Sequence, residues 1–210
     1  MSKHAIELVV LIGPKGSGKG EQSKILKEAF GFKVVCIGDI LRDRKAQGLL
    51  AQGMNNELKN NSLLDDEYIY SIVRPELEGL ALGARIVLDG FPRNHRQAEK
   101  FVQMCEEFGL SGRKGCRASV QFVEIFVSDE ETLERRMKRG REDDRNPKMI
   151  KRAIRDYWEA LPPMMRLLRN HFPVHDLNGM QKREEVARDL HLALKLIQRQ
   201  VLNPSPVEVA

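Results

Sequence analysis

One strand followed by a glycine-rich octapeptide constrains the fold of this chain more than any other feature. Residues 8–12 form a continuous apolar run, which is typical of a strand that a parallel sheet buries on both faces. Residues 13–20 read Gly-Pro-Lys-Gly-Ser-Gly-Lys-Gly and fit the spacing G-x-x-x-x-G-K between a strand and a helix. Glycines permit a tight turn with converging N–H groups, and the helix N-terminus adds partial positive charge. The segment predicts a loop that wraps phosphate groups; a glycine-rich turn without a ligand is the alternative.

Strand and helix patterns alternate along the rest of the chain. Strands are predicted at 8–12, 33–37, 85–89, 118–127 and 174–177. Helices are predicted at 18–30, 39–47, 67–79, 96–108, 129–139, 147–158, 164–170 and 184–201, with helical pieces within 54–64. Asp39 is expected to cap the helix at 39–47, and Ser128 or Asp129 is expected to cap the helix at 129–139. The alternation predicts an α/β fold with a parallel sheet and helices on both faces.

The order of these elements also predicts where a ligand binds. Ligands of open parallel sheets bind at the carboxyl ends of the strands. The loop at 13–20 and the turns at 37–39 and 89–91 each follow a strand. We therefore expect all three to open onto one crevice.

Composition limits the class of partner. The 35 Lys and Arg exceed the 30 Asp and Glu, and much of the excess lies in residues 135–155. Small phosphorylated substrates explain this charge as well as nucleic acid does. The sequence shows no basic segment interleaved with aromatic residues, which argues against nucleic-acid binding. The 3 cysteines form no disulfide or zinc pattern, which favours a reducing cytoplasm. The longest apolar run is too short to span a membrane, and no signal peptide is evident.

Two further strings join the phosphate loop. Residues 35–42 read Val-Cys-Ile-Gly-Asp-Ile-Leu-Arg, and residues 89–93 read Asp-Gly-Phe-Pro-Arg with Gln97 four positions on. Over nearly its whole length the chain resembles the adenylate kinase family of nucleoside monophosphate kinases, in a short-lid form. The resemblance implies a P-loop kinase core with a central parallel five-stranded sheet flanked by helices. It also implies a small helical monophosphate-binding lobe and a very short lid.

The resemblance divides the chain as follows. Residues 1–202 form a single kinase domain, with the core at 1–37, 71–138 and 148–202. The monophosphate-binding lobe covers 38–70, and the lid covers 139–147. Residues 203–210 are expected to be a flexible tail.

The implied activity is magnesium-dependent transfer of the ATP γ-phosphoryl group to a nucleoside monophosphate, with AMP favoured and two ADP formed. Transfer between two nucleotides gathers negative charges that positive groups must screen and align. No general base is needed, because the acceptor phosphate is already an anion. A monomer is expected by analogy.

The family's motifs assign roles to positions of this sequence. The ATP-binding set is Gly13, Gly16, Ser17, Gly18, Lys19, Gly20 and Arg135. The monophosphate-binding set is Gly38, Arg42, Gly90, Arg93 and Gln97. The catalytic set is Lys19, Arg93, Arg139, Arg141 and Arg152. Asp89 is expected to hold Mg²⁺ through water. Taken singly, Arg42 and Gln97 could be exposed helix residues, Asp89 a turn cap, and residues 135–141 a solvated face.

The chain departs from the family pattern at five places. Lys15 replaces a usual proline and is expected to point into solvent, and Glu21 replaces a usual threonine and is expected to point outward. Ile37 replaces a threonine that can hydrogen-bond near a base. The lid is shorter than in other short-lid members, which excludes water less well. Ala153 stands where an arginine is expected, and a shift of one residue would supply Arg152.

These departures keep two other functions open. Ile37 and Asn94 favour a kinase acting on UMP and CMP, whereas Gln97 favours adenine, because a side-chain amide can both donate to and accept from its edge. Glu21, Ala153 and the short lid instead favour a nucleotide-binding protein with weak catalysis.

Overall fold

The computed structural model describes residues 5–50, 65–110 and 118–196, and every structural statement below concerns those residues. They contain one five-stranded sheet in the order β2-β3-β1-β4-β5, in which every neighbouring pair is parallel. The strands are β1 (Ile6–Ile12), β2 (Lys33–Cys36), β3 (Arg85–Asp89), β4 (Ala118–Phe126) and β5 (Val174–Asn178). The predicted α/β fold with a five-stranded parallel sheet is confirmed.

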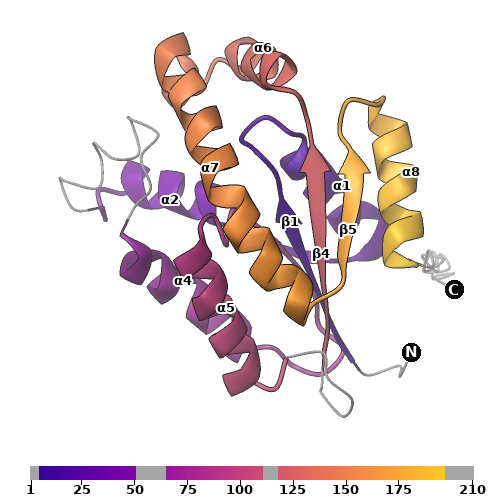
Figure 1. Cartoon of the computed structure of the whole chain (residues 1–210). Helices are drawn as coiled ribbons and strands as arrows, with labels where there is room; N and C mark the ends of the chain where they lie inside the picture. The colour runs from indigo at the N-terminus through magenta and orange to yellow at the C-terminus, as the bar shows by residue number, and fades with distance from the viewer. Residues whose placement is uncertain (1–4, 51–64, 111–117, 197–210) are drawn as a thin grey trace, which may run out of the picture.

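Helices cover both faces of this sheet, as Figure 1 shows. They are α1 (Lys19–Phe30), α2 (Ile37–Ala46), α4 (Asp66–Glu78), α5 (His95–Glu107), α6 (Asp129–Arg139), α7 (Pro147–His171) and α8 (Arg183–Leu194), with a 3-10 turn η1 (Glu142–Asp144). α4, α5 and α7 lie on one face, and α1 and α8 lie on the other. None of the described helices combines the length and the apolar character needed to cross a bilayer.

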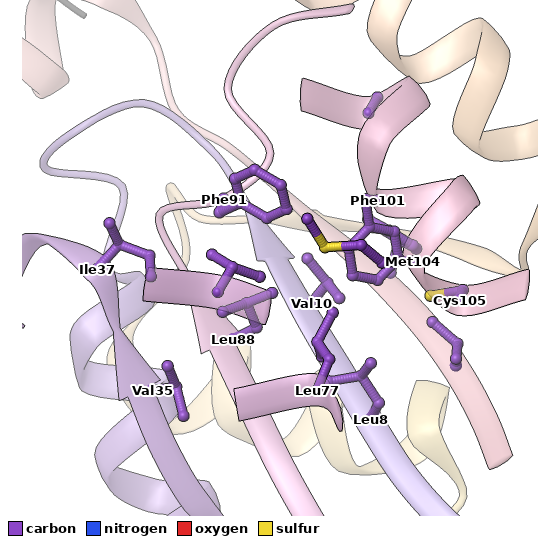
Figure 2. Close-up of a cluster of buried hydrophobic side chains, with 14 of the residues drawn as sticks. Leu8, Val10, Val35, Ile37, Leu77, Leu88, Phe91, Phe101, Met104 and Cys105 are labelled. Atoms are coloured by element: carbon purple, nitrogen blue, oxygen red, sulfur yellow. The ribbon is translucent and has the colours of Figure 1, made fainter. Parts of the chain in front are cut away.

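The central strand β1 explains the two layers. Its side chains alternate between faces, so Leu8 and Val10 join the core under α4, α5 and α7 (Figure 2). Val9 and Leu11 join the core under α1 and α8. A strand buried on both faces needs apolar residues at every position, which is why the run at 8–12 has no polar member.

Two predicted helix boundaries are wrong. Helices were predicted at 147–158 and 164–170, but α7 runs unbroken through Pro162 and Pro163. Leu161, Met164 and Leu168 are buried in the core, so packing outweighs the local cost of proline. The last helix was predicted to reach residue 201, but α8 ends at Leu194.

The end of α8 has a local cause. Lys195 adopts a left-handed conformation with φ 52°, which stops the helix. The N–H of Leu196 then donates to the carbonyl of His191 at 3.1 Å. The predicted tail at 203–210 and the predicted helical pieces within 54–64 lie outside the described residues.

The predicted N-cap residue is wrong for α2 and confirmed for α6. α2 begins at Ile37 with Cys36 as its N-cap residue, so Asp39 lies in the first turn and does not cap the helix as predicted. Its carboxylate pairs instead with Arg42 of the same helix. Ser128 caps α6 as predicted, because its Oγ accepts a hydrogen bond from the N–H of Glu131 at 3.3 Å.

Candidate active site

The loop between β1 and α1 is a tight glycine turn. Gly13, Gly16 and Gly18 have φ values of 156°, 96° and 98°. A Cβ on Gly13 would lie 2.6 Å from Ser17 Oγ, and one on Gly16 would lie 3.0 Å from Cγ of Arg136. Both glycines are therefore required by close packing as well as by conformation. Gly18 is the N-cap residue of α1 and offers no side-chain cap, and Gly20 lies in the first turn.

This loop forms one wall of a cavity of about 370 Å³. The cavity gathers residues from the ends of β1 and β3 and from α1, α6 and α7. Its lining residues are Leu11, Ile12, Gly13, Pro14, Lys15, Lys19, Gly90, Pro92, Arg93, Arg136, Arg152, Ala153, Ile154, Asp156, Tyr157 and Ala160. Three predicted catalytic residues, Lys19, Arg93 and Arg152, thus meet at one place although the sequence separates them widely.

Lys19 and Arg93 are held by backbone carbonyls. Lys19 Nζ donates to the carbonyls of Gly13 at 2.7 Å and Pro14 at 2.9 Å. Burial lowers the pKa of Lys19, and the nearby carboxylate of Asp89 opposes that shift. Arg93 Nε donates to the carbonyl of Gly90 at 2.8 Å. Both cations are thereby positioned at the carboxyl ends of β1 and β3.

Gly90 and Asp89 shape the turn after β3. Gly90 has φ 93°, and a Cβ there would lie 3.1 Å from Nη2 of Arg93, so a larger residue would crowd the guanidinium group. Asp89 ends β3 and is 7% exposed. The Cys36 thiol donates to Asp89 Oδ2 at 3.8 Å, because β2 and β3 pair Cys36 with Asp89. Asp89 thus combines burial with a position beside Lys19.

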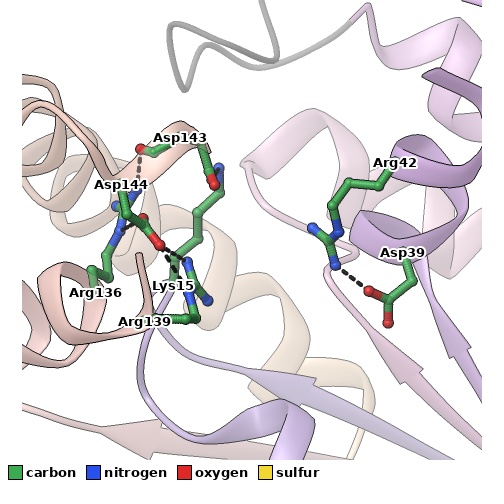
Figure 3. A network of polar contacts seen from close by, with 7 residues as sticks. All are labelled: Lys15, Asp39, Arg42, Arg136, Arg139, Asp143 and Asp144. Atoms are coloured by element: carbon green, nitrogen blue, oxygen red, sulfur yellow. Dashed lines mark hydrogen bonds and ion pairs between the residues drawn. The ribbon is translucent and has the colours of Figure 1, made fainter. Parts of the chain in front are cut away.

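A buried ion-pair network fixes the segment after α6 (Figure 3). Asp144 accepts from Arg136 Nε at 2.7 Å and from Arg139 at 2.6 and 2.8 Å. The side chains of Asp144 and Arg136 are 0% and 1% exposed. The predicted site omitted Arg136. Its place on the same helical face as Arg139, three residues on, was the signal that could have revealed it.

Lys15 belongs to the same network, and its predicted orientation is wrong. Its Nζ lies 3.2 Å from Asp143 Oδ2, and it lines the cavity instead of pointing into solvent. Burial and the charge of Arg93 lower the pKa of Lys15 to about 8, while Asp143 opposes the shift. An acidic partner on η1, far away in the sequence, decides this orientation.

A second group of arginines lies outside the cavity lining. Arg42 pairs with Asp39 on α2, and a Cβ on Gly38 would lie 3.3 Å from Arg42 Nη1. Burial and the positive charges of Arg139 and Arg42 lower the pKa of Arg141. Arg141 therefore lies close enough to both guanidinium groups to feel their charge. Arg42, Arg139 and Arg141 therefore lie near one another between α2 and the segment at 139–147.

The chain matches a known protein family over most of its length. The family model described as adenylate kinase matches residues 11–172 of this chain. The chain belongs to the adenylate kinase family. It is therefore a phosphotransferase.

Adenylate kinases from three bacteria illustrate the likeness. The chain is 31% identical to adenylate kinase of Thermus thermophilus over 193 residues, which covers 90% of this chain and 97% of the relative. It is 31% identical over 193 residues to that of Hyphomonas neptunium, covering 89% and 97%. It is 29% identical over 191 residues to that of Phocaeicola vulgatus, with the same coverage.

Other positions of this adenylate kinase family member lie away from the cavity wall. Gln97 is 1% exposed, so it is not a surface helix residue. Its Oε1 accepts from the N–H of Arg93 at 2.8 Å, and its Nε2 donates to Asp66 Oδ1 at 2.7 Å. Its predicted contact with adenine stays a prediction. The amide is, however, fixed beside Arg93.

The remaining residues that the sequence singled out lie in three places. Arg135 donates to Glu131 at 2.6 Å and to the carbonyl of Gly179 at 3.0 Å, which directs it toward the loop after β5. Glu21 forms an ion pair with Arg183 of α8 at 2.5 Å and does not line the cavity. This position agrees with the predicted outward orientation of Glu21. Arg152 and Ala153 both line the cavity.

Proposed function

We propose that this protein transfers the γ-phosphoryl group of ATP to AMP and forms two ADP. The observation that carries the proposal is the cavity that Lys19 and Arg93 share with the phosphate loop. A reaction between two nucleotides needs positive groups on both sides of the moving phosphoryl group. Lys19 follows β1 and Arg93 follows β3, so the two cations reach the cavity from adjacent strands.

Each predicted residue takes a role in that reaction. Residues 13–20 and Lys19 would bind the donor phosphates, and Arg135 would lie near the donor base. Arg93 and Arg42 would hold the acceptor phosphate, because a planar guanidinium fork can bind two oxygens at once. Gly38 and Gly90 leave room for these two arginines. Arg139, Arg141 and Arg152 would stabilise the transferring group.

The residues present fit a magnesium ion bound with the substrate. Mg²⁺ keeps several waters and binds through one or two carboxylates together with substrate phosphates. The part of the chain that the structure describes has no cluster of three or more metal-ligating side chains, but it has one buried carboxylate, Asp89, beside Lys19. Asp89 would hold the ion through water, and the ion would neutralise charge on the β- and γ-phosphates.

A coupled assay with ATP and magnesium tests the activity. AMP, CMP, UMP, GMP and dAMP are supplied in turn as acceptors, and ADP formation is followed. We expect turnover that is fastest with AMP. Lys19→Ala, purified in the same way, is the control for contaminating kinases. If none of the five acceptors gives turnover, the proposal is rejected. Nucleotide binding measured by calorimetry in the absence of turnover would instead support a binding protein.

A second acceptor class remains a candidate. Ile37 is 1% exposed, packs in the core and offers a base no side-chain hydrogen bond, which weakens selection for adenine. A UMP/CMP kinase would explain that feature. Gln97→Ala should reduce AMP use much more than CMP use if Gln97 reads adenine, whereas equal losses would reject that role. The monomeric state and the cytoplasmic location stay predictions.

A further inference from the structure

Lys15 makes a contact that the activity described so far does not use. It is the third residue of the phosphate loop, and its Nζ lies 3.2 Å from Oδ2 of Asp143, 128 positions away. The side chains of Lys15 and Asp143 are 33% and 22% exposed. Partial burial strengthens such a pair relative to one in bulk water. The ammonium group also faces the cavity that Lys19 and Arg93 line.

The partner of Lys15 is itself held in place. Asp143 lies in η1 next to Asp144, whose buried carboxylate binds Arg136 and Arg139. The carbonyl of Asp143 accepts from Arg136 Nη2 at 3.3 Å. Figure 3 shows Lys15 and Asp143 beside this network. The Lys15 contact therefore joins the phosphate loop to a point on the segment at 139–147 that buried ion pairs hold in place.

A second contact lies directly beside the first. Gly16, the next residue of the loop, packs against the aliphatic part of Arg136. Two consecutive residues of the phosphate loop thus contact this network. Lys15 forms an ion pair with Asp143, and Gly16 packs closely against Arg136. This arrangement fixes the distance between the phosphate loop and η1.

We propose that Lys15 is a positioning residue, which ties Asp143 and η1 to the phosphate loop and so keeps water away from the donor phosphates. The inference rests on the proposed function. A short lid excludes water less well, and a tether from the loop to η1 compensates for its length. Without the tether, water would replace the acceptor phosphate as the attacking group and release ADP and inorganic phosphate.

The electrostatic surroundings of Lys15 give the tether a pH dependence. The charged groups that act on it are Arg93 after β3, Asp143 on η1 and Arg136 on α6. Lys19 on α1 and Arg152 and Asp156 on α7 line the same cavity. Burial and then Arg93 lower the pKa of Lys15 to about 8, and Asp143 opposes this shift. The ammonium group is charged below that pH and neutral above it. The ion pair therefore weakens as the pH rises through about 8.

The first test compares two rates in the same preparation. The rate of ATP hydrolysis without acceptor is divided by the rate of phosphoryl transfer with acceptor. This ratio is measured for wild type, Lys15→Ala, Lys15→Arg and Lys24→Ala. Lys24 is the matched control, because it carries the same charge on the exposed face of α1 and pairs only weakly with Glu28 at 3.9 Å. We expect Lys15→Ala to raise the ratio about fivefold near pH 7, from the loss of roughly 1 kcal/mol of ion pairing.

The pH profile separates positioning from general stability. In the nucleotide-free protein, the stabilisation that Lys15 provides through Asp143 should weaken as the pH passes about 8, whereas Lys15→Arg should keep it, because a guanidinium group remains charged. Lys24→Ala should follow the wild type. An unchanged ratio in Lys15→Ala, or identical pH profiles of stability for nucleotide-free wild type and Lys15→Arg, would overturn the proposal.

The second test needs no substrate. A double-mutant cycle with Lys15→Ala and Asp143→Ala is measured by urea unfolding of the nucleotide-free protein. We expect a coupling of about fivefold in the unfolding equilibrium constant near pH 7, and a weaker coupling near pH 9.5. Absence of coupling near pH 7 would overturn the proposal. A wild type without phosphotransfer would reject the proposed function, yet the cycle would still decide whether the tether exists.

Discussion

Two aspartate–arginine pairs flank the proposed site and differ in burial. Asp144 and Arg136 are 0% and 1% exposed, whereas Asp39 and Arg42 are 62% and 44% exposed. Removing one partner of a buried pair leaves an uncompensated charge, whereas an exposed pair contributes little to stability. The buried pair therefore fixes structure. The exposed pair leaves Arg42 able to exchange its carboxylate partner for a phosphate at small cost.

The largest effect is expected at the buried pair. Asp144→Ala would leave Arg136 and Arg139 without their shared carboxylate, so the free energy of unfolding should fall by about 3–5 kcal/mol. Urea denaturation followed by circular dichroism measures it. A loss below about 1 kcal/mol would show that burial does not distinguish the two pairs.

The next effect concerns rate instead of stability. Lys19→Ala removes a preorganised charge from the cavity, so kcat for phosphoryl transfer should fall about 10²–10³-fold. Its two hydrogen bonds to loop carbonyls are replaceable by water, so the free energy of unfolding should change by less than about 1.5 kcal/mol. Steady-state kinetics and a thermal melt are the measurements. A normal kcat would remove Lys19 from the proposed site.

A smaller effect is expected at the exposed arginine. Arg42→Ala should weaken binding of the acceptor phosphate by about 1.5–3 kcal/mol, seen as a roughly ten- to hundredfold higher acceptor KM. The KM for ATP should stay close to that of the wild type, because Arg42 lies on α2 outside the cavity lining. Equal changes in both KM values would contradict an acceptor-side role.

The smallest effect is expected at the carboxylate that faces Arg42. Asp39→Ala removes an exposed ion pair, so the free energy of unfolding should change by no more than about 0.5 kcal/mol. Urea denaturation of Asp39→Ala and Asp144→Ala under the same conditions compares the contributions of the two carboxylates to stability. A loss as large as that of Asp144→Ala would end the contrast between the pairs.

Features carried by neighbouring residues were predictable from the sequence. The apolar run in β1, the glycine turn and the helix capped by Ser128 all depend on a few adjacent positions. Local pattern also misled, for example in α7, which was predicted as two separate helices on either side of Pro162 and Pro163. Burial of Leu161 and Met164 outweighed that preference, and burial depends on the whole fold.

The sequence by itself determined the parallel sheet, the phosphate loop and the set of positive residues offered to it, because strand alternation and turn chemistry are local. Only the tertiary structure decided which cations gather around one cavity and which are neutralised elsewhere. Lys15 turned inward because Asp143 lies beside it in space, and Arg136 was buried because Asp144 compensates its charge. Electrostatic partners are chosen by distance in space, and spacing along the chain does not encode that distance.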